Sequence, residues 1–288
     1  MPRLPIVLAS VFVLTAVARA DRMGPYASPV ERALRVPVVV VGKVTAVEKE
    51  PTDAPIYPGA AQKVAHTVVV VKVESNLAGA DALTHIRVGF VTPAAEKGAG
   101  IRPGRGLNNP ELKEGQEWLF FLTKSTDGKF YAIPYMTPPI ETKAEGYEAQ
   151  LASAKKVLAA VADPVKALKA EKAEDRFDAA VAIIYKSRAL PEGSRGATET
   201  VALSADESRL ILKALGGGAW KPAPASQTLN GYGAFAMLGL GAADGWKAPA
   251  IKPGEDFFEA MRGAFVTWLD GPGKEYRLKK LVLKKVEK

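Results

Sequence analysis

The chain contains no cysteine, and this absence excludes several kinds of chemistry at once. Without a thiol the protein has no thiolate nucleophile, no thiolate-bound zinc, no disulfide bond and no lipid-modified cysteine behind a leader peptide. An exported protein without disulfides depends on its hydrophobic core, and 288 residues with 48% hydrophobic side chains suffice to build one. This length also favours two domains over one.

Histidine is scarce as well, since only His66 and His85 are present. If residues 64–75 and 84–92 form an antiparallel hairpin, we expect the two imidazoles to lie about nine residues apart along it, or about 30 Å at ~3.3 Å per residue. At that distance they cannot share a metal ion. The sequence also lacks a GxSxG motif, and without a well-placed histidine a Ser-His-Asp arrangement is difficult to assemble.

Carboxylates are plentiful but do not form a recognised motif. Glu48, Glu50 and Asp53 lie closest together and could contribute to a calcium site, but they lack the regular spacing of a calcium loop, and solvated loop charges are the alternative. A carboxylate-dependent hydrolase would need two carboxyl groups within about 5 to 10 Å of each other. We expect no enzyme activity, no cofactor and no bound metal, and keep the hydrolase as an alternative.

The longest apolar run lies at the amino terminus. Arg3 precedes the 12 largely apolar residues 6–17, which fall short of the about 20 that a helix needs to span a bilayer. The tripeptide that ends at Ala20 fits the small-x-small rule for cleavage. We predict a signal peptide over residues 1–20, cleaved after Ala20, and a secreted or periplasmic protein. An uncleaved amino-terminal anchor is the alternative.

Positive charge is distributed unevenly along the chain. The formal net charge is +8, and removal of the predicted signal peptide, which holds two arginines and no acidic residue, leaves +6. Residues 274–288 hold seven Lys or Arg residues against Glu275 and Glu287, a local excess of +5. Most of the imbalance therefore belongs to the carboxy-terminal segment.

Residues 36–136 have the pattern of a small β-structure. Gly42 lies inside the first of two long runs of β-branched residues, where glycine marks a bulge or a sharp coil. Loops are predicted at residues 51–59 and 93–115. Five strands in about 100 residues fit a small barrel of the OB type. The predicted strands are Val38–Val47, Val64–Ser75, Thr84–Thr92, Glu117–Lys124 and Phe130–Met136.

Three segments of this region carry a family resemblance: VVVVGKVTAVE, HTVVVVKVESNLAGAD and LKEGQEWLFFLTKSTDGKFY. Together they resemble the TIMP-like or netrin-module form of the OB-fold found in secreted proteins, over about residues 36–136. The resemblance implies a fold and a binding role with an open ligand. TIMP inhibitors act through an amino-terminal cysteine that chelates the zinc of a metalloprotease, and a chain without cysteine cannot share that activity.

From Glu145 onward the hydrophobic period becomes that of helices. The first predicted helix carries an apolar stripe, and Asp163 and Pro164 restart a helix that continues to about Leu190. A polar connector follows it. The stripe consists of Tyr147, Leu151, Ala154, Leu158 and Val161, and further helices are predicted over residues 204–215, 229–241 and 256–269.

The predicted architecture is therefore a two-domain α and β protein. A five-stranded OB-like β-barrel domain occupies residues 21–142 behind the signal peptide, and a short helix capped at Ser28 precedes its first strand. An α-helical domain with a basic carboxy-terminal tail occupies residues 143–288.

The OB analogy places candidate binding residues in the loops. OB-folds bind at the barrel face that their loops flank, so the analogy points to Tyr57 and to Arg102 and Arg105 in the glycine-rich segment GAGIRPGRG. The backbone amides and arginines of that segment could hold an anion. It lacks the GK[ST] ending of a P-loop, and a connector without a site of its own is the alternative.

The carboxy-terminal segment YRLKKLVLKKVEK is the second candidate surface. It combines apolar positions with Lys279, Lys280, Lys284 and Lys285. Such a basic amphipathic element can bind anionic lipid or an acidic polymer. A final strand or helix that docks on the domain, with solvated lysines, is the alternative.

We therefore expect a secreted, non-catalytic binding or interaction protein whose partner is a protein or an anionic surface ligand. The alternative function is an envelope-surface or polyanion binder acting through the basic segment, whose binding would weaken steeply with salt. Export argues against a nucleic acid as partner.

Overall fold

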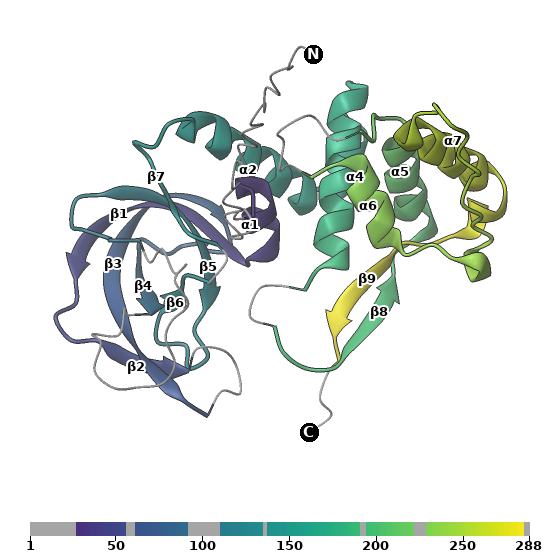
Figure 1. Cartoon of the computed structure of the whole chain (residues 1–288). Coiled ribbons are helices and arrows are strands. Elements are labelled where there is room, and N and C mark those ends of the chain that lie inside the picture. Colours follow the sequence, from purple (N-terminus) through teal and green to yellow (C-terminus); the bar gives the residue numbers. More distant parts are fainter. Residues whose placement is uncertain are drawn as a thin grey trace, which may run out of the picture.

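The structure, a computed structural model, describes residues 27–55, 61–91, 110–134, 137–190, 194–221 and 229–284. It is an α and β protein, with a mixed sheet in its first half and mainly helices in its second (Figure 1). Within the described ranges, no helix combines the length and the apolar character needed to cross a membrane. The predicted signal peptide lies outside these ranges.

Helix α1 (Pro29–Arg35) opens the described chain and has the predicted capping box. The Ser28 hydroxyl accepts a hydrogen bond from the Glu31 backbone at 3.3 Å, and the Glu31 carboxylate accepts one from the Ser28 backbone at 3.1 Å. Pro29 lies in the first turn, where a backbone N–H would have no intrahelical acceptor, so its absence costs the helix no hydrogen bond. The short helix expected before the first strand is confirmed.

The strand pairings of the first half lead back to the strand from which they start. Strand β1 pairs antiparallel with β3, and β3 with β4. Strand β4 pairs parallel with β6, which pairs antiparallel with β5, and β5 pairs antiparallel with β1. Among the described residues the sheet strands are β1 (Val38–Val47), β2 (Thr52–Pro55), β3 (Lys63–Ala78), β4 (His85–Val91), β5 (Glu117–Lys124), β6 (Tyr131–Ala132) and β7 (Ile140–Glu141).

Two of these strands occur where none was predicted. Strand β2 lies in a predicted loop and pairs only with the beginning of β3, and β7 adds two residues to β5. Both are short edge pairings stabilised by backbone hydrogen bonds, so their sequences need no alternation of apolar side chains. The last predicted strand is reduced within the described residues to the two residues of β6.

Gly42 lies where β1 pairs with two strands at once, opposite Val73 of β3 and Trp118 of β5. The register between β1 and β3 shifts beside it, as expected for a glycine inside a strand. A Cβ atom at this position would lie 2.8 Å from the carbonyl oxygen of Lys72 and would overlap the side chain of Val71. The missing side chain therefore permits the close approach of β3 to β1.

The helices predicted for the second half are confirmed, with one interruption. A turn after Leu168 separates α3 from α4, and the Arg176 guanidinium holds that turn by donating to the carbonyls of Ala170 at 2.8 Å and Glu171 at 2.6 Å. The helices are α2 (Tyr147–Ala162), α3 (Pro164–Leu168), α4 (Ala173–Arg188), α5 (Ala205–Gly216), α6 (Gly231–Leu238) and α7 (Phe257–Asp270), with short 3-10 helices at Ala242–Asp244 and Pro272–Glu275.

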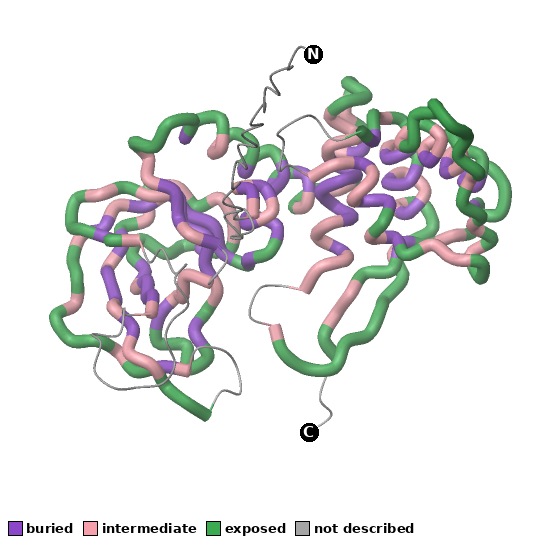
Figure 2. The backbone as a smooth tube through the Cα atoms, in the orientation of Figure 1, coloured by how far each residue is buried: buried purple, intermediate pink, exposed green. Residues whose placement is uncertain are grey.

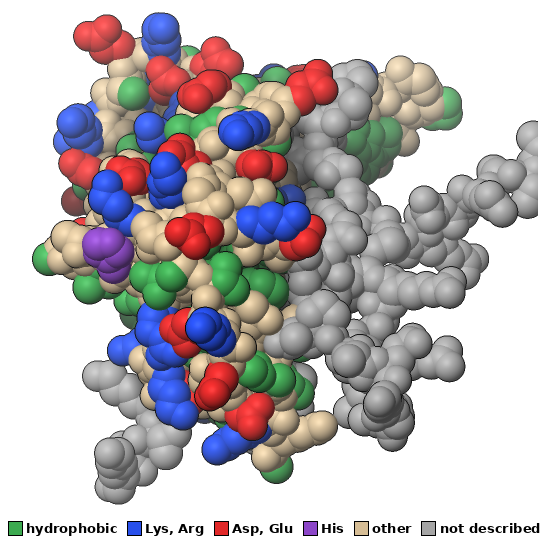
Figure 3. All heavy atoms as spheres, turned by 90° about the vertical axis from the view of Figure 1, so that its left-hand side faces the viewer, with side chains coloured by type: hydrophobic (Ala, Val, Ile, Leu, Met, Phe, Trp, Pro, Cys, Tyr) green, Lys and Arg blue, Asp and Glu red, His purple; other side chains and the backbone are tan. Residues whose placement is uncertain are grey.

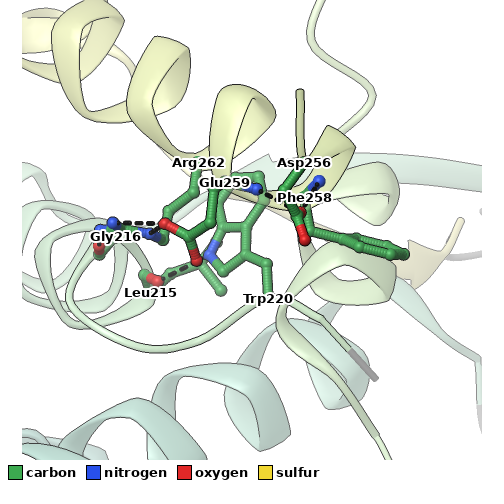
Figure 4. Close-up of polar contacts among 7 residues, drawn as sticks. All are labelled: Leu215, Gly216, Trp220, Asp256, Phe258, Glu259 and Arg262. Carbon is green, nitrogen blue, oxygen red and sulfur yellow. Dashed lines mark hydrogen bonds and ion pairs between the residues drawn. The ribbon is translucent and has the colours of Figure 1, made fainter. Parts of the chain in front are cut away.

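The core of the helical half is built around aromatic side chains, with Trp220 fully buried at its centre. The Trp220 indole donates to the Leu215 carbonyl at 2.9 Å (Figure 4). Beside it, Arg262 of α7 donates to the Gly216 carbonyl at 3.2 Å and pairs with Glu259 at 2.7 Å. These contacts satisfy carbonyls at the end of α5 and fix α7 across it.

A hydrophobic cluster joins the two halves. It combines Val39 of β1 and Phe121 of β5 with Leu158 of α2 and Ala182 of α4, and α1 packs between them (Figure 1). Lys186 of α4 also donates to a carbonyl oxygen of α1, that of Leu34, at 2.8 Å. Helices α1 and α2 thus connect the sheet to the helices.

Candidate functional surface

The second half contains a pair of strands that projects from its helices. Strands β8 (Thr198–Ala202) and β9 (Lys279–Leu283) pair antiparallel and form what we call the β8–β9 ribbon (Figure 1). Of the alternatives for the basic segment, the structure shows a strand. Strand β8 lies in the predicted polar connector, and the sequence contains no signal for it because neither of its faces is buried.

The root of the ribbon is fixed to the helical core. Leu278, immediately before β9, is fully buried, and its backbone donates to the Ser208 hydroxyl of α5 at 3.0 Å. The Arg277 guanidinium donates to the Leu203 carbonyl at 2.6 Å. These contacts hold the ribbon in position without covering it.

The ribbon itself is exposed. All five residues of β8 are exposed, and β9 is exposed or half-buried throughout (Figure 2). Val201 is 50% exposed and Leu283 is 39% exposed, although apolar side chains of this size usually contribute to stability through burial. The outer surface of the ribbon therefore adds little to the core.

The register determines which backbone groups point outward. The backbone of Leu203 donates to Leu278 at 2.8 Å, and that of Lys284 donates to Ala197 at 2.9 Å. In an antiparallel pair such hydrogen-bonded positions alternate with positions whose N–H and C=O point away from the partner strand. The outward positions of β8 are therefore Thr198, Thr200 and Ala202, and those of β9 are Lys279, Leu281 and Leu283.

Positive charge gathers at the ribbon. Lys279, Lys280 and Lys284 are exposed, and no ion pair joins any of them to a carboxylate in the described part of the chain. Burial lowers the pKa of Lys186 on the neighbouring helix α4, and the charge of Lys280 lowers it further. This surface therefore favours a negatively charged partner.

Four of the predicted binding residues are not described by the structure. Tyr57, Arg102, Arg105 and Lys285 lie outside the described residues. The face of the sheet half seen in Figure 3 carries acidic and basic side chains side by side, without a large patch of one sign. Within the described residues, no group of three or more histidines, aspartates or glutamates is arranged to hold a metal ion.

Glu48, expected to be a solvated loop charge, is instead paired. The Arg87 guanidinium donates to its two carboxylate oxygens, each at 2.7 Å, in a bidentate ion pair. The hydrogen bond from Arg87 lowers the pKa of Glu48. This geometry joins β4 to the end of β1, and the carboxylate is occupied by the ion pair.

The two histidines lie apart, at a shorter spacing than predicted. His66 is opposite Val91 and His85 is opposite Lys72, so the two are six positions apart along β3, or about 20 Å instead of the predicted 30 Å. The predicted spacing is nine positions, whereas the register of β3 and β4 places His85 opposite Lys72. The conclusion that they cannot share a metal is unchanged.

His66 is buried, 4% exposed, with its ring centroid 5.1 Å from that of Phe130. Its Nδ1 donates to the Val64 carbonyl at 2.9 Å. Burial lowers the pKa of His66 and outweighs the backbone of Thr52 and the charge of Asp127, which favour the protonated form.

We predict that this imidazole makes stability depend on pH. The unfolded chain has the ordinary histidine pKa of 6.5 and binds protons more readily than the folded chain. The free energy of unfolding should therefore be constant above that pH and fall as the pH decreases toward the folded pKa of His66. Urea titrations from pH 8 to pH 5 measure it.

The two histidines supply the control for this prediction. His66→Gln should remove the fall in stability, whereas His85→Gln, at an exposed position, should retain it. An unchanged pH dependence in His66→Gln would contradict the assignment.

Fold and surface together define an α and β protein that presents an exposed, basic two-stranded ribbon. The sequence matches no protein-family model, and no curated protein matches it significantly.

Proposed function

We propose that this chain is an exported, non-catalytic binding protein in which an OB-like domain of the TIMP or netrin kind supports a helical domain that presents the β8–β9 ribbon to a partner. The proposed domains are residues 21–142 and 143–288. Ligand capture, rather than turnover, is the proposed activity.

The order of the strand pairings supports the OB part of this proposal. Numbered without the short edge strands β2 and β7, the pairings run first to second, second to third, third to fifth, fifth to fourth and fourth to first. The third and fifth strands are the parallel pair. An OB-fold is a five-stranded Greek-key barrel, and both this order of pairings and the resemblance over residues 36–136 are consistent with it.

The observation that carries the binding function is the exposure of the ribbon. Its root is held by buried contacts, while Val201 and Leu283 are left open to solvent. A two-stranded ribbon is at best marginally stable by itself, so it persists because the core anchors it. An anchored ribbon with exposed apolar and basic side chains is suited to contact a partner.

The test is a selection of peptide ligands from a displayed random library on the chain from Asp21 to Lys288. We expect selected ligands to lose at least about tenfold in affinity when Val201→Asp is introduced, since a charge then replaces an apolar contact. Val165→Asp is the matched control, because Val165 on α3 is 46% exposed and Val201 is 50% exposed. Ligands that bind both variants equally would contradict the proposal.

The three exposed lysines favour a second candidate, a polyanion binder on an envelope surface. Lys279, Lys280 and Lys284 would contact phosphate or sulfate groups as point charges. Binding of this kind weakens steeply as salt rises, which distinguishes it from a contact made through the backbone and apolar side chains.

A further inference from the structure

We propose that the outer edge of β8 binds an acidic, extended segment of a partner protein as a third strand of the β8–β9 ribbon. This inference rests on the proposed binding function and names the class of partner and the mode of binding.

The edge of β8 offers backbone groups for pairing. The outward N–H groups of Thr198, Thr200 and Ala202 donate no hydrogen bond to any residue that the structure describes, and their outward C=O groups accept none from such a residue. An unpaired edge of this kind is a template for an incoming strand, whose backbone supplies the affinity and whose side chains supply the specificity.

The edge of β9 is less suited to this role. Arg188 at the end of α4 donates to the outward carbonyl of Lys279 at 3.0 Å, and its Nε donates to Met237 at 2.7 Å. The guanidinium thus already donates to one of the carbonyl oxygens that a strand on this side would need as an acceptor. The proposal therefore assigns the partner to β8.

Charge selects the partner. Lys279, Lys280 and Lys284 lie on or beside β9, and Arg277 precedes them, whereas Glu199 is the acidic residue of the two strands. A second copy of the ribbon would bring the same excess of positive charge, which disfavours self-association. A strand rich in aspartate or glutamate would be attracted.

The apolar side chains suggest alternation within that segment. Lys280 and Lys284 share one face of the ribbon, and Leu281 and Leu283 share the other, since side chains alternate along each strand and pair across it. A partner strand with a β-branched residue at every second position would extend the face that carries Leu281 and Leu283. The acidic residues would then occupy the positions between.

Thr200→Pro provides the test. The N–H of this residue points outward, so proline removes a donor from the free edge and leaves the pairing with β9 intact, a placement that edge strands tolerate. Thr200→Ala is the matched control, because it removes the same side chain and keeps the N–H. The probe is a blocked, fluorescently labelled peptide of alternating glutamate and valine, and anisotropy measures its affinity.

We expect the peptide to bind Thr200→Pro about tenfold more weakly than wild type, which corresponds to the loss of the one backbone hydrogen bond that the Thr200 N–H would donate. Binding to Thr200→Ala should stay within about twofold. Equal binding to wild type and Thr200→Pro overturns the edge assignment. Circular dichroism of both variants checks that the fold is kept.

N-methylation of the peptide tests the same pairing without altering the protein. Methyl groups on one set of alternate amides should abolish binding, and those on the other set should leave it intact, since only one set faces β8. Loss in both sets or in neither overturns strand addition.

Three further outcomes separate this inference from the function on which it rests. Equal binding of a lysine–valine peptide overturns the acidic partner. Another outcome is that binding falls steeply with salt and in the variants Lys279→Gln, Lys280→Gln and Lys284→Gln, and stays unchanged in Thr200→Pro. In that case the surface binds polyanions. Strand addition is then contradicted, but a binding function is retained. If ligands from the library selection bind Val201→Asp as tightly as wild type, the proposed function is contradicted as well.

Discussion

Trp220→Ala is expected to lower the free energy of unfolding by about 3–5 kcal/mol, the cost of truncating a fully buried aromatic side chain. The indole lies with its ring centroid 4.9 Å from that of Phe235 and 5.3 Å from that of Phe265. Its removal leaves a cavity between α5, α6 and α7, and leaves the Leu215 carbonyl without its donor. Urea denaturation followed by far-ultraviolet circular dichroism measures the loss.

Two variants locate this effect. Trp220→Phe keeps most of the packing and should cost less than Trp220→Ala, and Val165→Ala, at an exposed position, should change stability by no more than about 0.5 kcal/mol. A loss below about 1 kcal/mol in Trp220→Ala would show that this indole does not organise the helical core.

Gly42→Ala is expected to destabilise the sheet half by about 1–3 kcal/mol, the cost of forcing a side chain into a packed site. The new methyl group would overlap Val71 and approach the Lys72 carbonyl. Strand β1 cannot move aside, because it pairs with β3 on one edge and with β5 on the other.

Gly263→Ala is the matched control and should raise the free energy of unfolding instead of lowering it. Gly263 lies in α7, and apart from its chain neighbours and the backbone of its own helix, a Cβ atom there meets no atom of the described residues within 4 Å. Alanine in a helix interior is favoured over glycine by about 0.8–1.0 kcal/mol. Urea denaturation of the two variants and the wild type under one set of conditions gives the sign of the stability change for each variant. Stabilisation by Gly42→Ala would mean that β1 and β3 are not in close contact at this point.

Local signals in the sequence account for most of the regular elements. The capping box at Ser28, the glycine inside β1 and the apolar stripe of α2 each depend on residues close together in the chain, and each has its expected counterpart. Ser204 and Asp256 likewise cap α5 and α7. Such features follow from periodicity and backbone preference.

The sequence predicted the basic segment of the candidate surface but not its partner strand β8. The lysines of the basic segment stood out by their charge, but their partner strand β8 did not, because an exposed strand needs no apolar alternation. The pairing of Glu48 with Arg87 likewise could not be predicted from the sequence, because only the register of β1, β3 and β4 brings these residues together.

By itself the sequence determined the absence of thiol chemistry, the order of strands before helices and the basic character of the carboxy-terminal segment, because these depend on composition and local pattern. Tertiary structure decided which backbone groups of the β8–β9 ribbon face outward and which edge Arg188 occupies. It also decided that His66 is buried while His85 is exposed. Contacts between residues distant in the chain set these properties, and no local pattern encodes them.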